Sequence, residues 1–277
     1  MDVSTIMQNT SKLAVIGAGK MGETLIKALI EAKILAAGQI VATAKHAHRL
    51  EEVTARLGVP ATLDNREAVS NTEVVLLGVK PQALRGVLAE IKPVIRGDQL
   101  VVSIAASATT AFIERHLEKP APVVRAMPNT PALVGAGMTA LCRGAYANDE
   151  HLARARQIFD AVGRTVIIDE KYMDAVTALS ASGPAYIYVI LESLAEGGLK
   201  VGLPRQVATE LAAQMCFGAA KMVLETGAHP ALLKDAVTTP AGCTIDGILQ
   251  LEEGGLRVTL IKAVVEATRR AAQLIES

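Results

Sequence analysis

The stretch Leu13-Ala-Val-Ile-Gly-Ala-Gly-Lys-Met-Gly22 combines a short apolar run with three closely spaced glycines. Its first four residues are apolar and predict a buried strand, and three glycines follow where a helix would begin. In such a turn the first glycine allows the tight bend, the second lets the backbone approach an anion, and the third lets helix and strand pack closely. Glycines that serve only as turn residues are the alternative, but the strand–turn–helix context favours a dinucleotide-binding loop. Its predicted cofactor contacts are Gly17, Ala18, Gly19, Lys20, Met21 and Gly22.

Short apolar runs alternate with helical patterns on both sides of this stretch. Strands are predicted over residues 13–16, 40–43, 74–77, 100–104, 123–127, 137–141 and 165–168. Helices are predicted over residues 20–33, 46–57 and 82–91. Short apolar strands separated by helices are typical of a parallel sheet that is covered on both faces. The predicted fold class is therefore α/β, with an N-terminal doubly wound, Rossmann-like dinucleotide-binding domain over residues 1–168.

The second part of the chain, residues 169–277, has no further apolar strand runs and reads as helical. Its final helix repeats apolar residues on one face at Leu256, Leu260 and Val264. A small domain with so much apolar helix surface favours contact with another subunit, and packing onto its own sheet domain is the alternative. We therefore expect an all-helical domain that dimerises the protein and contributes to substrate binding.

The composition excludes several classes of partner. The chain of 277 residues has 28 Lys and Arg against 28 Asp and Glu, whereas proteins that bind nucleic acid or anionic membranes normally carry a basic surplus. Aromatic residues make up 3% and Trp is absent, which argues against a base-stacking surface. No nucleic acid is expected as a partner.

The sequence also favours a soluble, cytoplasmic protein. The longest uncharged stretches, residues 126–142 and 175–191, contain prolines and glycines and are too short to cross a bilayer, so no membrane partner is expected. Residues 1–11 are polar and do not resemble a signal peptide. The three cysteines form no CxxC pair, so neither a disulfide framework nor a metal site is predicted.

The segment after the second strand indicates which dinucleotide is bound. An NAD site usually has a carboxylate there for the ribose hydroxyls, but no Asp or Glu occurs before Glu51. A cationic and hydroxylic cluster takes its place and would suit the 2′-phosphate of NADPH; a solvated helix start that happens to be basic is the alternative. We predict NADPH as the cofactor, with NADH left open. The predicted contacts of this cluster are Thr43, Lys45, His46 and Arg49.

Two later segments follow strands at the same predicted edge of the sheet. Val79 and Lys80 come after the strand at 74–77, and the loop Met127-Pro-Asn-Thr-Pro131 follows the strand at 123–127. Ligands of open α/β sheets bind outside the carboxyl ends of the strands, so Val79, Lys80 and Asn129 are candidate cofactor contacts. An ordinary exposed lysine and an ordinary rigid turn are the alternatives.

The helical half contains a candidate anion site. No histidine lies in a catalytic-looking context, which favours reduction of a C=N bond over oxidation of an alcohol. In Thr238-Thr-Pro-Ala-Gly-Cys-Thr244 a turn precedes a helix, and the free N–H groups of Gly242, Cys243 and Thr244 would suit a carboxylate. A plain helix N-cap is the alternative.

Taken together, the motifs resemble the pyrroline-5-carboxylate reductase family. The resemblance runs from about Leu13 to the last helix and is carried by residues 16–21, 79–82, 127–131, 174–186 and 240–252. Two departures occur in the turn, where Ala241 replaces a usual Gly and Cys243 precedes the key Thr.

The resemblance implies reduction of 1-pyrroline-5-carboxylate to L-proline, the last step of proline biosynthesis, by hydride transfer from the nicotinamide C4. It implies that Thr244 hydrogen-bonds the ring nitrogen as the catalytic residue, and that the backbone of Thr239, Gly242 and Cys243 holds the substrate carboxylate. By the same resemblance Asn65, Lys80 and Ala106 touch the nucleotide, and Glu170 lies near the substrate. The family's helical domains interlock in a homodimer whose subunits share their active sites, and the dimers often assemble into a ring of five.

Two other functions remain open on the sequence. The chain can be another imine reductase or a β-hydroxyacid reductase, for which Lys200 is the candidate catalytic lysine. From a different class, it can be a non-catalytic NADPH-binding sensor, which would bind the cofactor without turnover.

Overall fold

The computed structural model describes residues 12–273 and divides them into two compact units. The first unit contains the chain up to Ala181 together with the end of the last helix from Ala267, and the second contains residues 182–266. The segment at residues 1–11, for which no signal peptide was expected, lies outside the described residues. The first unit extends beyond residue 168, and the domain boundary predicted at residue 168 stays a prediction.

The first unit is built on an eight-stranded sheet with the order β3-β2-β1-β4-β5-β6-β7-β8. This order confirms the predicted doubly wound α/β fold, and the neighbours β1 and β4 mark the point where the strand order reverses. The strands are β1 (Leu13–Ile16), β2 (Ile40–Thr43), β3 (Ala61–Thr62), β4 (Val74–Leu77), β5 (Leu100–Ser103), β6 (Val123–Met127), β7 (Gly137–Arg143) and β8 (Gly163–Ile167).

One part of the predicted parallel sheet is wrong. All neighbouring strands pair in parallel except β6 and β7, which are antiparallel. Between them lies only a loop with the short 3-10 helix Thr130–Val134. Parallel strands need a crossover of a dozen or more residues, so a connection this short returns the chain in the opposite direction.

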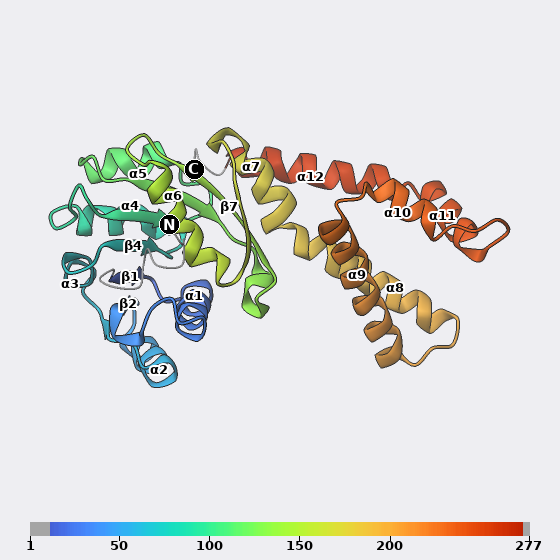
Figure 1. Ribbon diagram of the computed structural model, residues 1–277, viewed down its shortest axis with the longest axis horizontal. Helices are drawn as coiled ribbons and strands as arrows, with labels where there is room; N and C mark the ends of the chain where they lie inside the picture. The colour runs from blue at the N-terminus through green and yellow to red at the C-terminus, as the bar shows by residue number, and fades with distance from the viewer. Residues whose placement is uncertain (1–11, 274–277) are drawn as a thin grey trace. The chain divides into compact units, whose positions relative to one another are not determined.

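Helices cover both faces of this sheet (Figure 1). The side chains of β1 alternate between two cores: Leu13 and Val15 belong to one, and Ala14 and Ile16 to the other. The first core includes residues of α1 (Lys20–Glu31), α2 (Ala47–Leu57) and α6 (Asp149–Asp160). The second includes residues of α3 (Asn65–Ser70), α4 (Pro81–Ile91) and α5 (Thr110–Leu117). Each fully buried aliphatic side chain contributes about 1.5–3 kcal/mol to this packing, which makes the sheet a rigid base for the loops at its edges.

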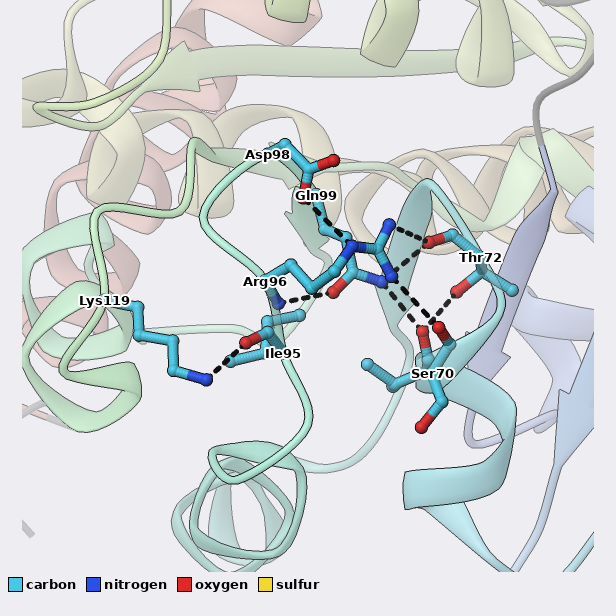
Figure 2. Close-up of polar contacts among 8 residues, drawn as sticks. Ser70, Thr72, Ile95, Arg96, Asp98, Gln99 and Lys119 are labelled. Atoms are coloured by element: carbon cyan, nitrogen blue, oxygen red, sulfur yellow. Dashed lines mark hydrogen bonds and ion pairs between the residues drawn. The ribbon is translucent and has the colours of Figure 1, made fainter.

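A polar network closes the edge of the sheet at which β4 and β5 begin (Figure 2). The buried Gln99 donates through Nε2 to the carbonyl oxygens of Val69 and Thr72, at 2.8 and 2.7 Å. Arg96 donates to the carbonyl oxygens of Ser70 and Thr72, at 3.0 and 3.2 Å. These carbonyls lie at the end of α3, where a helix leaves its last acceptors unsatisfied. The network therefore stabilises the edge where these strands begin, which is opposite the edge at their carboxyl ends where folds of this kind bind ligands.

The second unit is helical and has very little core of its own. Its helices are α8 (Gly183–Lys200), α9 (Arg205–Thr226), α10 (Pro230–Ala236), α11 (Cys243–Glu253) and most of α12 (Leu256–Gln273). Helices α8 and α9 lie side by side, and a Cβ on Gly198 would come within 2.8 Å of the Ala208 Cβ (Figure 1). Among the described residues of this unit, the buried apolar ones are Ala195, Ala208 and Ala212.

Large apolar side chains of the second unit are exposed instead. They include Ile187, Tyr188, Val189, Leu194, Val207, Leu211, Met215, Phe217, Met222 and Leu224. An exposed apolar surface of this extent is typical of an interface with another molecule. Two helical stretches, Glu170–Lys200 and Arg205–Thr226, are also long and apolar enough to cross a membrane, although length and composition alone are weak evidence for that.

Candidate nucleotide and substrate sites

The glycine-rich loop connects β1 to α1 and is fixed by the end of β2. The Gly17 N–H donates to both the carbonyl and the hydroxyl oxygen of Thr43, at 3.2 Å each, and the Ala18 N–H donates to the same carbonyl at 2.7 Å. Gly19 is the N-cap of α1 and has no side-chain cap, and a Cβ at this position would meet no atom within 4 Å. The start of α1 therefore presents free N–H groups to open space, as an anion-binding helix terminus requires.

The loops after β1 and β4 approach each other closely at the point where the strand order reverses. A Cβ on Gly78 would lie 2.9 Å from the Gly17 carbonyl oxygen, and a Cβ on Gly17 would lie 2.7 Å from Val79 Cγ1. Lys80 follows as the N-cap of α4, and its exposed ammonium group has no partner among the described residues. The structure thus brings the glycine-rich loop, Val79 and Lys80 to one edge of the sheet, the edge at which such folds bind nucleotides.

The loop after β5 ends at the same edge. It contains the half-buried Ala106, and its neighbour Ser107 has a φ of +64°. This left-handed conformation costs a residue with a side chain roughly 1–2 kcal/mol, and such backbone strain is common at functional sites. Sequence reasoning did not identify Ser107, because nothing in its residue type signals a positive φ.

Thr43 and Asn65, two predicted nucleotide contacts, lie close together, and their side chains are hydrogen-bonded to each other. The Thr43 hydroxyl donates to Asn65 Oδ1 at 2.7 Å, and Asn65 Nδ2 donates to Glu90 Oε2 at 2.9 Å. Because the Thr43 hydroxyl also accepts from Gly17 N–H, this chain of hydrogen bonds holds the glycine-rich loop against β2 and α3. A direct contact of either residue with the nucleotide stays a prediction.

The basic side chains near the start of α2 differ in whether a carboxylate already binds them. Lys45 and His46 are exposed, and the His46 ring stacks on the His48 ring at a centroid distance of 5.7 Å. Arg49 is engaged with two carboxylates, and the hydrogen bonds that it donates to Glu52 and Glu23 raise its pKa. Lys45 and His46 are therefore available to an anion as they are placed, whereas Arg49 would first have to release a partner.

Asn129 fixes the rigid loop after β6. Its Oδ1 accepts from the Met138 N–H at 2.9 Å, and its Nδ2 donates to the Ser180 carbonyl oxygen at 3.3 Å. These bonds join the loop to β7 and to the π-helix Thr177–Ala181. Asn129 thus has a clear positioning role, and its predicted contact with the cofactor stays a prediction.

Glu170 lies in a buried polar cluster of the first unit. Its carboxylate accepts from the Thr110 N–H at 2.8 Å and from the Thr110 hydroxyl at 2.6 Å, and it pairs with Arg125 at 3.3 Å. Burial and the Glu170 charge raise the pKa of the nearby Cys142 to about 12, so this thiol stays protonated and is no nucleophile at neutral pH. Sequence reasoning missed Arg125, although a single charge inside the apolar strand at residues 123–127 was a usable signal.

The candidate substrate turn lies in the second unit. The Gly242 N–H donates to the Thr239 carbonyl oxygen at 3.0 Å and closes a turn with Pro240 and Ala241 at its centre. A Cβ on Gly242 would lie 2.5 Å from the Thr239 hydroxyl oxygen, so a larger residue at this position would displace the Thr239 side chain. Of the N–H groups predicted to be free, that of Gly242 is therefore already used inside the turn.

Helix α11 begins directly after this turn and has no side-chain cap. The first N–H groups of the helix, on Cys243 and Thr244, are therefore free to bind an anion. Cys243 is exposed and Thr244 is half-buried, and the Thr244 hydroxyl has no partner among residues 12–273. Within that range, no group of three or more His, Cys, Asp or Glu side chains is placed to hold a metal ion.

Ala241, which replaces a glycine of the family pattern, has a φ of +57°. We expect Ala241→Gly to raise the free energy of unfolding by about 1 kcal/mol, because glycine adopts this conformation without a clash of its Cβ. Gly242→Ala is the matched substitution and is expected to lower the free energy of unfolding, since its Cβ would collide with Thr239. Urea unfolding of both variants at one protein concentration tests this, and an Ala241→Gly variant no more stable than the parent would contradict it.

Known protein families match both parts of the chain. Residues 12–107 match the family model described as NADP oxidoreductase, coenzyme F420-dependent, and residues 170–274 match the model described as pyrroline-5-carboxylate reductase dimerisation. Pyrroline-5-carboxylate reductase of Methanosarcina acetivorans is 43% identical over 97% of this chain and 99% of that protein.

Solved structures show the same likeness. The structure of a pyrroline-5-carboxylate reductase from Coxiella burnetii has a TM-score of 0.90 and 38% identity, covering 96% of this chain and 99% of that one. The structure of Plasmodium falciparum pyrroline carboxylate reductase with NADP bound has a TM-score of 0.86 and 29% identity, covering 97% and 99%.

Proposed function

The chain belongs to the pyrroline-5-carboxylate reductase family, and we propose that it reduces the imine of 1-pyrroline-5-carboxylate to L-proline with NADPH. The observation that carries this proposal is the likeness over nearly the whole chain, which includes both the glycine-rich loop and the turn before α11. Similarity confined to the nucleotide-binding unit would support only a dinucleotide-binding protein.

The nucleotide-binding unit contributes binding and orientation. The free N–H groups at the start of α1 hold the pyrophosphate, and the Lys80 ammonium adds a positive charge at the same edge. NADPH, when bound, supplies the hydride that the imine carbon accepts. Lys45 and His46, exposed at the start of α2, suit the 2′-phosphate and support NADPH over NADH.

The turn before α11 contributes the substrate contacts. The N–H groups of Cys243 and Thr244 hold the substrate carboxylate at a helix N-terminus, where the dipole favours negative charge. The substrate reacts as the protonated imine, and the Thr244 hydroxyl accepts a hydrogen bond from its ring N–H. Hydride addition to the carbon turns the C=N double bond into the single bond of a neutral amine, so no further proton is needed. The hydrogen bond to Thr244 orients the imine for hydride transfer and is kept in the amine product.

The assembly is a homodimer formed through the helical unit, in which each active site takes residues from both subunits. The exposed apolar side chains of α8 and α9, together with the dimerisation family model, support a protein partner for these helices over a membrane. The family resemblance supports further assembly of the dimers into a ring of five in the cytoplasm. The balance of 28 Lys and Arg against 28 Asp and Glu supports an enzyme without nucleic-acid or anionic-membrane partners.

The proposal predicts that the protein oxidises NADPH when 1-pyrroline-5-carboxylate is added, faster than it oxidises NADH at equal concentration. The decrease in NADPH absorbance measures this, and a control without substrate excludes spontaneous oxidation. Turnover with NADH preferred would retain the reaction and contradict the role of Lys45 and His46. Cofactor binding without turnover of this substrate would contradict the proposal in favour of another reductase or a sensor.

A further inference from the structure

Arg49 is connected to the glycine-rich loop as well as to two carboxylates. Its Nε donates to the Ala18 carbonyl oxygen at 3.1 Å, one of its terminal nitrogens bonds to Glu23 of α1, and the other bonds to Glu52 at 2.9 Å. The guanidinium therefore lies beside the loop that binds the pyrophosphate, although the residue itself belongs to α2. In folds of this kind the adenosine ribose binds next to the end of the second strand, which directly precedes α2.

The two carboxylates that hold Arg49 differ in their surroundings. The Glu23 side chain is 12% exposed and also pairs with Arg56 at 2.8 Å, so it is held by two arginines. The Glu52 side chain is 55% exposed, and the hydrogen bond from Arg49 lowers its pKa, which keeps it ionised at neutral pH. Exposed ion pairs contribute little to stability, so Glu52 is the partner that Arg49 can release at small cost.

We propose that Glu52 occupies Arg49 in the free protein and yields it to the 2′-phosphate of NADPH, so that Glu52 limits the preference for the phosphorylated cofactor. The inference rests on the proposed function. Arg49 stays anchored by Ala18 and Glu23 throughout and is therefore a preorganised phosphate ligand once Glu52 has left. The terminal nitrogen that Glu52 releases then donates to the phosphate, whose charge of about −1.5 to −2 attracts the guanidinium more strongly than the single charge of an exposed carboxylate does.

The inference predicts that Glu52→Gln tightens the binding of NADPH on the order of fivefold and leaves the binding of NADH unchanged. Glutamine keeps the shape of the side chain and removes the charge that competes with the phosphate. Glu51→Gln is the matched control, since it removes the same charge from an adjacent exposed residue that has no partner among residues 12–273.

The measurement is calorimetric titration of the full-length protein and its variants with 2′,5′-ADP, ADP, NADPH and NADH. These probes report binding without turnover and isolate the 2′-phosphate. We expect Glu52→Gln to tighten 2′,5′-ADP and NADPH selectively, and we expect this gain to disappear when Arg49→Gln is added to the same protein.

Equal effects of Glu51→Gln and Glu52→Gln on NADPH affinity would overturn the inference, because the net charge alone would then explain the change. No effect of either substitution would overturn it as well. A gain that persists in the Arg49→Gln background would also overturn it. If the parent protein binds neither NADPH nor NADH, the proposed function fails and the inference fails with it. If the parent binds NADPH and only the selective gain is missing, the inference alone fails.

Discussion

Glu170→Ala is expected to lower the free energy of unfolding by about 3–5 kcal/mol, the range for breaking a buried ion pair by removing one partner. Arg125, 1% exposed in β6, would lose the carboxylate that pairs with it, and two of its nitrogens already have no hydrogen-bond partner in the described part of the chain. Thr110 would also lose the acceptor for its N–H and its hydroxyl at the start of α5. Urea unfolding at one fixed protein concentration measures the change, since stability of an oligomer depends on concentration.

Two further variants separate a structural role of Glu170 from a role in substrate binding. Adding Arg125→Met to Glu170→Ala is expected to recover part of the lost stability, because the unpaired buried charge is then removed. Glu51→Ala, at an exposed position, is the control and is expected to change little. A loss below about 1 kcal/mol, combined with a raised KM, would contradict this prediction and favour the substrate contact that the family resemblance implies.

Those elements that local sequence patterns determine were predicted correctly. The bounds of β1, β2, β4 and β6 agree with the predicted ranges, because strands buried on both faces are made mostly of apolar residues. Strand β3 was missed because it has only the residues Ala61–Thr62, too few to show any pattern. The antiparallel direction of β7 was not predicted, although the loop before it is too short for the crossover that parallel strands need.

In the candidate sites too, features set by local sequence were predicted and contacts between distant residues were not. The glycine-rich loop was found because the spacing of its glycines is itself the structural requirement. Three partners were not found: Glu23 of Arg49, Ser180 of Asn129 and Thr110 of Glu170, which lie 26, 51 and 60 positions away in the sequence. Only the folded sheet brings such pairs together, so spacing along the chain contains no signal for them.

Thr244→Val is expected to lower kcat/KM by about 10–100-fold, which corresponds to the loss of a hydrogen bond to a charged group. Valine keeps the volume and the backbone N–H of residue 244 and removes only the hydroxyl, which has no partner among the described residues and is therefore available to the substrate. Initial rates with 1-pyrroline-5-carboxylate and saturating NADPH measure the effect, and Thr244→Ser should restore most of the activity.

Thr238→Val is the matched control, because it removes a hydroxyl from the same turn that already donates to the Lys234 carbonyl oxygen at 2.8 Å. If the Thr244 hydroxyl bond is stronger in the transition state than in the bound substrate, kcat and kcat/KM fall together. If the bond is equally strong in both, KM rises alone. If Thr244→Val turns over as fast as the parent, the hydroxyl does not contact the ring nitrogen. The N–H groups of Cys243 and Thr244 would then be the whole contribution of this turn, and they would fix the position of the carboxylate without acting on the imine.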